Sequence, residues 1–507
     1  MLLVVTLAIS DFTIADAVIP SIVRDLNLSV SDLGRSFTAY FAAAAASMVL
    51  MGRLGDVLGR RRLLLVAVAL FAAGTLLSGI AWDSTTFFGG RVLAGLALAA
   101  ALPNGLGVLN ALYPSTGHDR ERAFGLWATA IGAAAVLGPL IAGAAAATSV
   151  SWRWAFLGAI PLGLIAGVGI RAKIPDNEPR GRSHIDLGGA LLLAVAVGGL
   201  ALAVDTGARD WIGPPDRASG YPLLPAVLLL VSAAAFVALL AVQRHRFRRG
   251  REVIAPPAVL RSPSFRLATI GSAFMSVGDT GFQLALPLLL GFVLGATEFG
   301  VGAVLACYGV GALFGGPIAA RLSRRFDDQL VARLALTSLP LLLLALLPFL
   351  SEHAPLAAIA ALLVAYGLAW AIAYARLVNM SYQEVPEQDS AVAGGVQSAM
   401  RLLAGALGAA ILTAMFAGVA AHRADDADDL DAATHIAVAE SLDPSDVISS
   451  HQRLDPDPQP LSADGGAARV AEDAYTAGAR AVILLAAAIT AIALVVALRI
   501  PRPPLRR

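Results

Sequence analysis

The chain has 507 residues, of which 57% are hydrophobic and only 14% are charged, and its formal net charge is +1 at pH 7. Soluble domains carry charge on roughly a quarter of their residues, so this composition excludes an ordinary soluble protein and indicates a membrane protein. The near-zero net charge argues against a nucleic-acid partner, and the single cysteine, Cys307, allows neither an intrachain disulfide nor a cysteine metal cluster.

Apolar runs of about twenty residues recur along the chain, which is the length that a helix needs to cross a hydrocarbon layer of roughly 30 Å. The alternating pattern of a membrane barrel is absent. The sequence therefore predicts an all-α membrane protein with about fourteen transmembrane helices. The predicted spans are residues 2–23, 34–51, 63–81, 87–112, 124–147, 152–172, 187–208, 221–242, 267–291, 300–320, 331–350, 355–378, 392–421 and 477–500.

Basic residues mark one membrane face. They occupy alternate loops, within residues 53–62, 120–122, 173–182, 244–251, 321–325 and 502–507. The opposite short loops hold only Arg24, Arg209 and Arg217, with Arg35 and Arg153 at adjoining span edges. Because cytoplasmic loops carry the excess of Lys and Arg, both termini are expected in the cytoplasm.

Two polar stretches, 175–186 and 244–266, enclose one pair of spans and leave six spans on either side. We expect an N-terminal six-helix bundle at 1–172, linkers with an inserted helix pair at 173–266, and a C-terminal six-helix bundle at 267–507. The last bundle contains a long external loop, 422–476, which is rich in Asp, Ser and Pro. We expect this loop to be mobile or loosely helical and to have no catalytic role.

The first span carries two acids, Asp11 and Asp16. Each costs on the order of 2.5 to 3.5 kcal/mol to insert unless it is paired, protonated or facing water. Five residues of helix turn the two side chains about 140° apart, so we expect them to have different partners. Such acids do not suit the core of a signal peptide, and we expect the span to remain in the mature protein. A structural hydrogen bond to a neighbouring helix is the alternative to a role in proton exchange.

The turn between the second and third spans combines one acid, three glycines and a block of arginines. Its glycines permit close helix approach and a tight bend, and its acid can pair with arginine or with a helix N-terminus. The turn resembles the loop signature of the major facilitator superfamily, which implies a latch that holds one conformation of a transporter. Anchoring by positive charge explains the arginines but not the acid. The second-half counterpart, 315–325, lacks the acid. The residues concerned are Gly52, Gly55, Asp56, Gly59, Arg60 and Arg61.

The first span also resembles the first-helix signature of the fourteen-span drug:proton antiporters of the EmrB/QacA type. Asp11, Thr13, Ile14 and Pro20 match that signature, whereas Asp16 stands where relatives usually have asparagine. The resemblance implies the major facilitator fold, with two six-helix bundles plus an inserted helix pair.

Two further motifs resemble this superfamily. Arg91, followed by Val-Leu-Ala-Gly in the fourth span, looks like its intramembrane arginine motif. We hypothesise that Arg91 keeps a carboxylate of the first bundle ionised until substrate or proton competes; a snorkelling arginine near the membrane edge is the alternative. In the fifth span, a glycine and proline pattern resembles the motif of the superfamily's antiporters and implies a kinked, smooth helix surface. Its residues are Gly132, Gly138, Pro139 and Gly143.

The second half places Asp279 and Arg401 within otherwise apolar runs, as candidates for proton coupling or substrate binding. Tyr366, Trp370 and Tyr374 recur every fourth residue and form one helix stripe. This stripe can stack on a flat or cationic substrate, and ordinary aromatic packing is the alternative.

No nucleotide-binding loop, zinc-protease spacing or nucleophile elbow occurs in the sequence, so an enzyme is not expected. We expect proton-coupled efflux of small amphipathic compounds, such as drugs or antibiotics, by alternating access. The expected partners are a small-molecule substrate, protons and the lipid bilayer, with no cofactor, no metal and a monomeric state. The expected location is a bacterial cytoplasmic membrane. The alternatives are transport of one endogenous metabolite or nutrient, and a non-transporting membrane receptor or scaffold.

Overall fold

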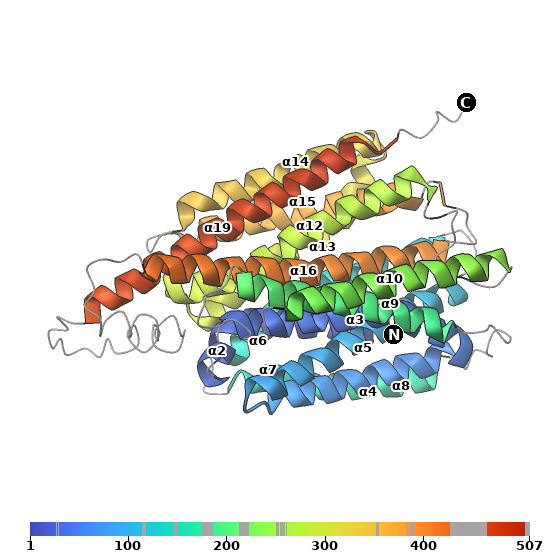
Figure 1. The fold of residues 1–507 in the computed structure, drawn as a ribbon, viewed down its shortest axis with the longest axis horizontal. Coiled ribbons are helices and arrows are strands. Elements are labelled where there is room, and N and C mark those ends of the chain that lie inside the picture. Colours follow the sequence, from blue (N-terminus) through green and yellow to red (C-terminus); the bar gives the residue numbers. More distant parts are fainter. Residues whose placement is uncertain are drawn as a thin grey trace.

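The structure is a computed structural model that describes residues 1–26, 28, 30–113, 118–146, 151–174, 186–211, 223–249, 253, 259, 261–350, 354–382, 384–385, 390–425 and 464–501. Every regular element in these residues is a helix, and the helices run roughly side by side (Figure 1). The elements are α1 (Leu2–Ala17), α2 (Ile19–Leu26), α3 (Val30–Leu58), α4 (Arg60–Gly79), α5 (Ser84–Leu112), α6 (His118–Ala146), α7 (Arg153–Leu157), α8 (Ala159–Lys173), α9 (Leu187–Trp211), α10 (Leu224–Arg248), α12 (Pro263–Leu288), η2 (Leu289–Val293), α13 (Glu298–Leu322), α14 (Asp328–Leu346), η3 (Leu347–Phe349), α15 (Leu356–Tyr382), α16 (Ser390–Asp425) and α19 (Asp464–Leu498).

Twelve helices in the described residues are long and apolar enough to cross a membrane. The two other predicted spans are helical as well. Span 2–23 is divided into α1 and α2, because Pro20 has no N–H to donate to the carbonyl of Asp16 four residues earlier. Span 124–147 lies in α6, where Thr129–Ala145 forms a shorter apolar helix. The predicted all-helical membrane class is therefore confirmed, with twelve to fourteen spans.

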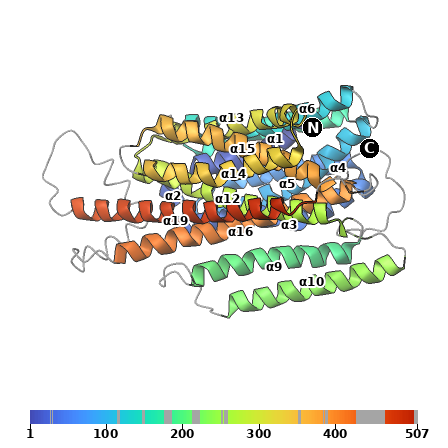
Figure 2. The ribbon, with the colours of Figure 1, turned by 90° about the horizontal axis from the view of Figure 1, so that it is seen from above.

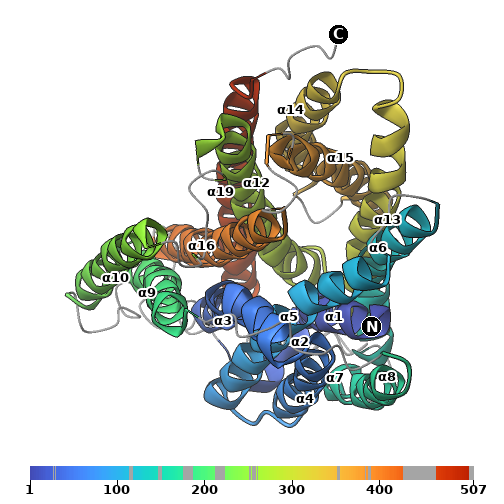
Figure 3. The same cartoon turned by 90° about the vertical axis from the view of Figure 1, so that its right-hand side faces the viewer.

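The helices fall into two groups that meet along one interface. Viewed along their axes, α1 to α8 lie on one side and α12 to α19 on the other (Figure 3). The interface is made by α6 against α13 and by α3 against α16, with α1 and α2 touching α12. Side chains near residues 14–22 and 282–293 share one buried apolar cluster, so the core is continuous across this interface.

The inserted pair α9 and α10 lies outside both groups, next to α3 and α16 (Figures 2 and 3). Val197 and Ala201 of α9 belong to the same buried cluster as Ala44 of α3 and Leu402 of α16. The Ser232 hydroxyl on α10 donates to the carbonyl of Ala196 at 2.6 Å and ties the pair together. The pair therefore contacts both groups of helices through α9.

One end of the bundle, opposite the arginine-rich turn at 52–64, is closed by contacts between the two groups. We call it the sealed end. A Cβ at Gly291 would lie 2.9 Å from Pro20 Cγ, so the Gly291 backbone packs against the Pro20 ring there. The Ser21 hydroxyl donates to Glu298 of α13. At the same end Asp25 accepts hydrogen bonds from Trp152 at 2.8 Å and from Arg153 at 2.6 Å.

Side-chain caps fix several helix starts. Asp83 accepts from the backbone N–H of Thr86 at 2.7 Å, and hydrogen bonding by the Thr86 side chain and then by its backbone holds the pKa of Asp83 below its usual value. Ser262 caps α12 at Phe265 and also donates to Glu384 at 2.6 Å, which lowers the pKa of Glu384. These contacts lie in the connections between spans.

Of the predicted external loop 422–476, residues 426–463 lie outside the described part of the chain. On either side of them the structure is helical, since α16 continues to Asp425 and α19 begins at Asp464. Both flanking helices therefore extend beyond the apolar spans that the sequence predicted.

Candidate functional site

Arg91 of α5 lies in the interior of the first group of helices, and only 1% of its side chain is exposed. Nη1 donates to Asp11 Oδ2 at 2.7 Å, and Nη2 donates to Ser78 Oγ at 2.7 Å. The guanidinium carbon also lies 5.3 Å from the ring centroid of Phe87 and 5.0 Å from that of Phe156. Arg91 is thus held in a buried ion pair, and the snorkelling alternative is wrong.

Glycine residues bring α4 and α5 close enough for this contact. A Cβ at Gly90 would lie 2.3 Å from Ser78 Oγ, and a Cβ at Gly74 would lie 2.8 Å from the backbone nitrogen of Ala94. Because both distances are shorter than any real contact, only glycine permits this helix approach. The packing places the Ser78 hydroxyl within reach of the guanidinium.

Both carboxylate oxygens of Asp11 are occupied. Oδ2 accepts from Arg91, and Oδ1 accepts from the Thr75 hydroxyl at 3.2 Å and more distantly from Arg91 Nη2 at 3.4 Å. The Asp11 side chain is 1% exposed, like its partner. Asp11 therefore has a complete set of buried hydrogen-bond partners on α4 and α5.

Asp16 has a different environment from Asp11. It is buried at 3% exposure, and its Oδ1 accepts no hydrogen bond within the described part of the chain. Its electrostatic neighbour is Asp279 of α12, which belongs to the other group of helices. The two acids of the first span thus have different partners, as the 140° separation about the helix axis requires.

Asp279 is the second member of this pair of acids and is 6% exposed. Its Oδ2 accepts from Gln283 Nε2 at 2.8 Å and more weakly from the Tyr308 hydroxyl at 3.4 Å. Its Oδ1 accepts no hydrogen bond from the described residues. Two buried carboxyl groups, one from each group of helices, therefore interact electrostatically, and Oδ1 of each accepts no hydrogen bond within the described part of the chain.

The aromatic stripe of α15 lies beside Asp279. Tyr366 is almost fully buried next to that carboxylate, and its ring is 6.0 Å from the ring of Tyr308. Further along the helix, Trp370 and Tyr374 stack at 5.2 Å with 15° between their planes. The Trp370 indole nitrogen is buried and has no hydrogen-bond acceptor among the described residues.

Arg401 of α16 completes this region. Its guanidinium lies 5.6 Å from the ring centroid of Tyr374, and it acts electrostatically on Asp279. The structure thus brings Asp279, Arg401 and the aromatic stripe together within the second group of helices, and Asp16 of the first group interacts electrostatically with Asp279. Asp11 and Arg91 form a separate cluster within the first group.

The predicted latch turn is built on close contact with α5. A Cβ at Gly55 would lie 1.6 Å from Asn104 Oδ1, and Gly52 lies against Pro103. Gly59 has a φ of 99°, which side-chain-bearing residues rarely adopt. Asp56 pairs with Arg60 at 2.9 Å, and Arg61 donates to the carbonyl of Arg171.

The glycine motif of α6 forms a seam with two neighbouring helices. A Cβ at Gly132 would lie 2.8 Å from Leu313, and one at Gly143 would lie 2.9 Å from the carbonyl of Glu298, both on α13. Gly138 faces α1, where a Cβ would lie 1.9 Å from Thr13 Oγ1. Pro139 contacts α13, since a Cβ at Gly302 of that helix would lie 2.4 Å from the Pro139 carbonyl oxygen. The smooth surface implied by the motif is therefore the surface on which the two groups meet.

Sequence reasoning missed several polar partners of these residues. Thr75, Ser78 and Tyr308 are single polar residues in apolar spans, a pattern too common to select them. Gln283 follows Asp279 by four residues, a spacing that indicates one helix face and could have identified it. The second-half counterpart of the latch turn, 315–325, contains no acid, but an acid follows it at the start of α14. This residue, Asp328, pairs with Arg376 of α15 at 2.9 Å and accepts from Asn379 at 2.7 Å.

Several named proteins are similar to this chain. A probable actinorhodin transporter of Streptomyces coelicolor is 28% identical over 81% of this chain and 70% of its own length. Puromycin resistance protein pur8 of Streptomyces alboniger is 30% identical over 83% of this chain and 81% of its own length. An uncharacterized MFS-type transporter, EfpA of Mycobacterium tuberculosis, is 31% identical over 58% of this chain, and the match spans 55% of that protein.

Solved structures show the same fold at low identity. A bacterial homologue of the human lysosomal transporter Spinster, in an inward-facing and occupied conformation, has a TM-score of 0.62 at 16% identity, with 99% of this chain and 97% of that chain covered. The human organic anion transporter MFSD10 has a TM-score of 0.56 at 14% identity, with 98% and 97% covered. The family model of the Major Facilitator Superfamily matches residues 1–409. With the helical arrangement described above, this match shows that the chain belongs to the Major Facilitator Superfamily.

Proposed function

We propose that this transporter exports small amphipathic compounds, such as drugs or antibiotics, in exchange for protons. It would act as a monomer of the fourteen-span drug:proton antiporter type in a bacterial cytoplasmic membrane, with the proton gradient as its energy source. Relatives named for puromycin resistance and for actinorhodin transport support efflux. A multidrug transporter protein, MdtP of Bacillus subtilis, 26% identical over 58% of this chain, supports it as well.

The observation that carries the proposal is the electrostatic interaction of two buried acids, Asp16 of the first group of helices and Asp279 of the second. Two ionised carboxylates repel each other strongly where the dielectric is low, so the pair is stabilised by binding a proton or a positive charge. The unused Oδ1 atom of each residue is available for this purpose. A proton bound at these two oxygens lowers their affinity for a cationic cargo, and a bound cargo lowers their affinity for a proton. This competition is the physical basis of exchange.

Asp11 and Arg91 would serve this exchange indirectly. Asp11 matches the first-helix signature of the drug:proton antiporters and was a candidate for proton exchange, but both of its oxygens are engaged by Arg91 and Thr75. Breaking the ion pair between Asp11 and Arg91 would leave both charges unpaired in the interior. We therefore assign proton exchange to Asp16 and Asp279, and we assign to the Asp11–Arg91 pair the task of holding α1 against α4 and α5.

The aromatic stripe would bind the apolar part of the cargo. Trp370 and Tyr374 present stacked faces next to Arg401, and Tyr366 lies against Asp279. A flat cargo can stack on these rings while its polar end reaches the pair of acids. Arg401 limits the net negative charge of the region and suits cargo that carries both polar and apolar groups.

Alternating access would use the interface seams. By the distribution of basic residues, the sealed end faces outward and the arginine-rich turn faces the cytoplasm. Opening the sealed end requires Pro20 to leave Gly291 and Ser21 to leave Glu298. The glycine seam of α6 against α13 allows one group of helices to rock on the other, and the Asp56 turn would hold one of the two states.

Transport by proteoliposomes under an imposed pH gradient tests the assignment, with puromycin as cargo. Asp16→Asn and Asp279→Asn should each abolish gradient-driven puromycin movement while leaving a folded protein. Asp205→Asn is the matched control, because Asp205 is also a buried membrane acid, at 4% exposure, but lies on α9 of the inserted pair. Undiminished transport by both Asp16→Asn and Asp279→Asn would exclude the pair as the exchange site.

Asp11→Asn separates the two clusters in the same assay. If gradient-driven transport per folded molecule stops in Asp11→Asn, while Asp16→Asn and Asp279→Asn still pump, then Asp11 is the coupling acid and our assignment is wrong.

A second candidate function is export of one endogenous secondary metabolite, which the actinorhodin-transporter relative favours. Growth-inhibition assays in a host without its own pumps separate the two. Protection against several unrelated compounds supports broad efflux, whereas protection against a single compound supports the metabolite. A non-transporting receptor would show no cargo-dependent proton flux with any compound.

A further inference from the structure

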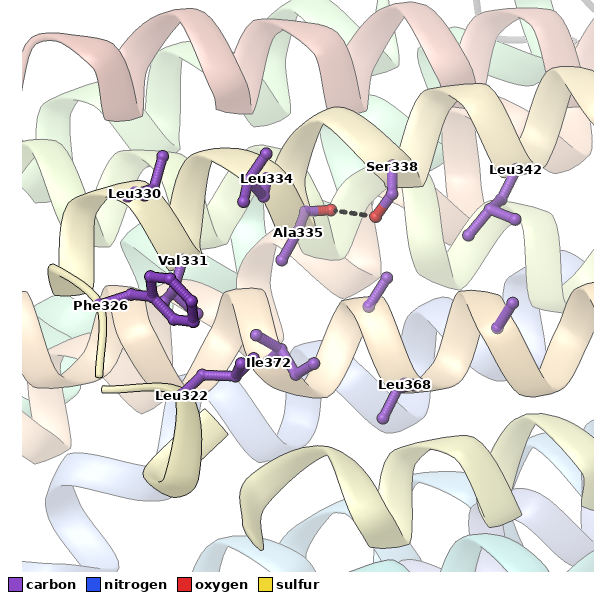
Figure 4. Close-up of a pocket in the computed structure, with 12 residues that line it drawn as sticks. Leu322, Phe326, Leu330, Val331, Leu334, Ala335, Ser338, Leu342, Leu368 and Ile372 are labelled. Atoms are coloured by element: carbon purple, nitrogen blue, oxygen red, sulfur yellow. Dashed lines mark hydrogen bonds between the residues drawn. The ribbon is translucent and has the colours of Figure 1, made fainter. Parts of the chain in front are cut away.

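A narrow apolar groove of about 420 Å³ runs along the outer surface between α14 and α15 (Figure 4). Leu330, Leu334 and Leu342 of α14 line it on one side, and Leu368 and Ile372 of α15 line it on the other. Leu334 is 63% exposed, so the groove opens to the surroundings of the protein and not to its interior. For a membrane helix, those surroundings are lipid.

The groove offers little to a polar ligand. Ser338 is the hydroxyl-bearing residue in its lining, and that hydroxyl donates to the carbonyl of Ala335 within its own helix at 2.8 Å. Between Leu330 and Leu342 the groove extends for about 18 Å at 1.5 Å per residue. Half of a hydrocarbon core of roughly 30 Å is about 15 Å, so the groove matches the depth of one leaflet.

One end of the groove carries positive charge. Leu322 and Phe326 line this end, and the turn between them contains Arg324 and Arg325, both exposed. Within the described residues, neither arginine makes a salt bridge. The charged residues in the turn at 321–328 are Arg321, Arg324, Arg325, Asp327 and Asp328, and Asp328 is paired with Arg376 of α15. Four arginines against two aspartates leave two positive charges.

We propose that this groove is a binding site for an anionic phospholipid. One acyl chain would lie between Leu334 and Ile372, and the phosphate would bind Arg324 and Arg325 at the membrane surface. Charge complementarity selects an anionic headgroup, because a basic cluster next to the hydrocarbon region attracts acidic lipids. The site lies away from Asp16 and Asp279 and does not depend on the proposed transport function.

Native mass spectrometry of the purified, delipidated full chain tests the proposal with added phosphatidylglycerol or phosphatidylcholine. Wild type should retain at least one phosphatidylglycerol more tightly than phosphatidylcholine. Each arginine near an anionic surface contributes about fivefold in affinity, so the double variant Arg324→Gln/Arg325→Gln should weaken phosphatidylglycerol binding roughly 25-fold. Phosphatidylcholine binding should change little. The charge control is Arg248→Gln/Arg249→Gln, two adjacent exposed arginines at the end of α10.

A second variant tests the acyl-chain part. Leu334→Trp should fill the groove and remove one bound lipid of either headgroup. Leu341→Trp is the matched control, since Leu341 is 59% exposed on the same helix but does not line the groove. Phosphatidylglycerol binding that is unchanged in both Arg324→Gln/Arg325→Gln and Leu334→Trp would overturn the proposal. An equal loss in the two control variants would overturn it too, because binding would then depend on general surface charge and apolarity.

Discussion

The buried pair of Asp11 and Arg91 leads to a quantitative prediction about stability. Both side chains are 1% exposed and lie 2.7 Å apart. Removing one member of such a pair leaves the other charged and unpaired, which costs about 3 to 5 kcal/mol. We therefore expect Asp11→Asn to destabilise the folded transporter by an amount in this range.

The two single variants should differ in a defined order. In Arg91→Met the remaining Asp11 carboxylate can bind a proton and become neutral, whereas in Asp11→Asn the Arg91 guanidinium stays charged at any accessible pH. Ser78, Phe87 and Phe156 continue to contact that guanidinium and reduce the loss, but they do not neutralise it. Asp11→Asn should therefore be the more destabilising change. The double variant Asp11→Asn/Arg91→Met should be more stable than Asp11→Asn alone.

The native cysteine provides the assay. Cys307 is the only cysteine of the chain, it lies half-buried in α13, and its thiol donates to the carbonyl of Ala303. A thiol-reactive fluorescent dye therefore reports unfolding as this site becomes accessible on heating. Additive effects of the two single variants would show that the pair carries no coupling energy. Greater destabilisation by Arg91→Met than by Asp11→Asn would contradict the asymmetry.

Three further outcomes are expected. Gly138→Val should prevent folding, because its added carbons meet α1, while Gly169→Val, with nothing within 4 Å of a Cβ, should fold and serve as the control in expression and thermal-unfolding measurements. Asp56→Asn should change stability by at most about 1 kcal/mol, since its pair with Arg60 is partly exposed, but should lower puromycin transport clearly if the turn is a latch. Glu384→Gln should reduce the fall in thermal stability at acid pH. The pKa of Glu384 is lower in the folded protein than in the unfolded chain, so its carboxylate stabilises the fold at pH values above the unfolded-state pKa. This stabilisation is lost in the wild type as the pH falls through the folded-state pKa, and the glutamine variant has none to lose.

The helices could be predicted well from the sequence, because a membrane span needs a long apolar run and little else. The interruption at Val18 between α1 and α2 could not be predicted as readily. Pro20 was noted as part of a motif, yet its effect is local: it removes one backbone hydrogen bond and divides the first span into two helices. The extension of α16 and α19 beyond their apolar spans was not predicted, because helix formation outside the membrane does not require an apolar sequence.

The pairing of the buried charges could be predicted only in part. The angle between Asp11 and Asp16 about the helix axis follows from five residues of helix, so different partners were expected. The identity of those partners depends on how α5 and α12 rotate and pack, and no local pattern encodes that rotation. For the same reason the sequence did not distinguish Asp11 from Asp16 and Asp279 as candidates, because the oxygens that accept no hydrogen bond are visible only in three dimensions.

The position of α9 bears on turnover. Since Val197 and Ala201 share a buried cluster with α3 and α16, the inserted pair is fastened to both halves of the carrier at once. When one half tilts, α9 must lose its apolar contact with either α3 or α16. The free energy of that contact is then added to the barrier between the inward-open and outward-open forms. A carrier with an extra helix pair of this kind can thus adjust its cycling speed by substitutions far from its cargo.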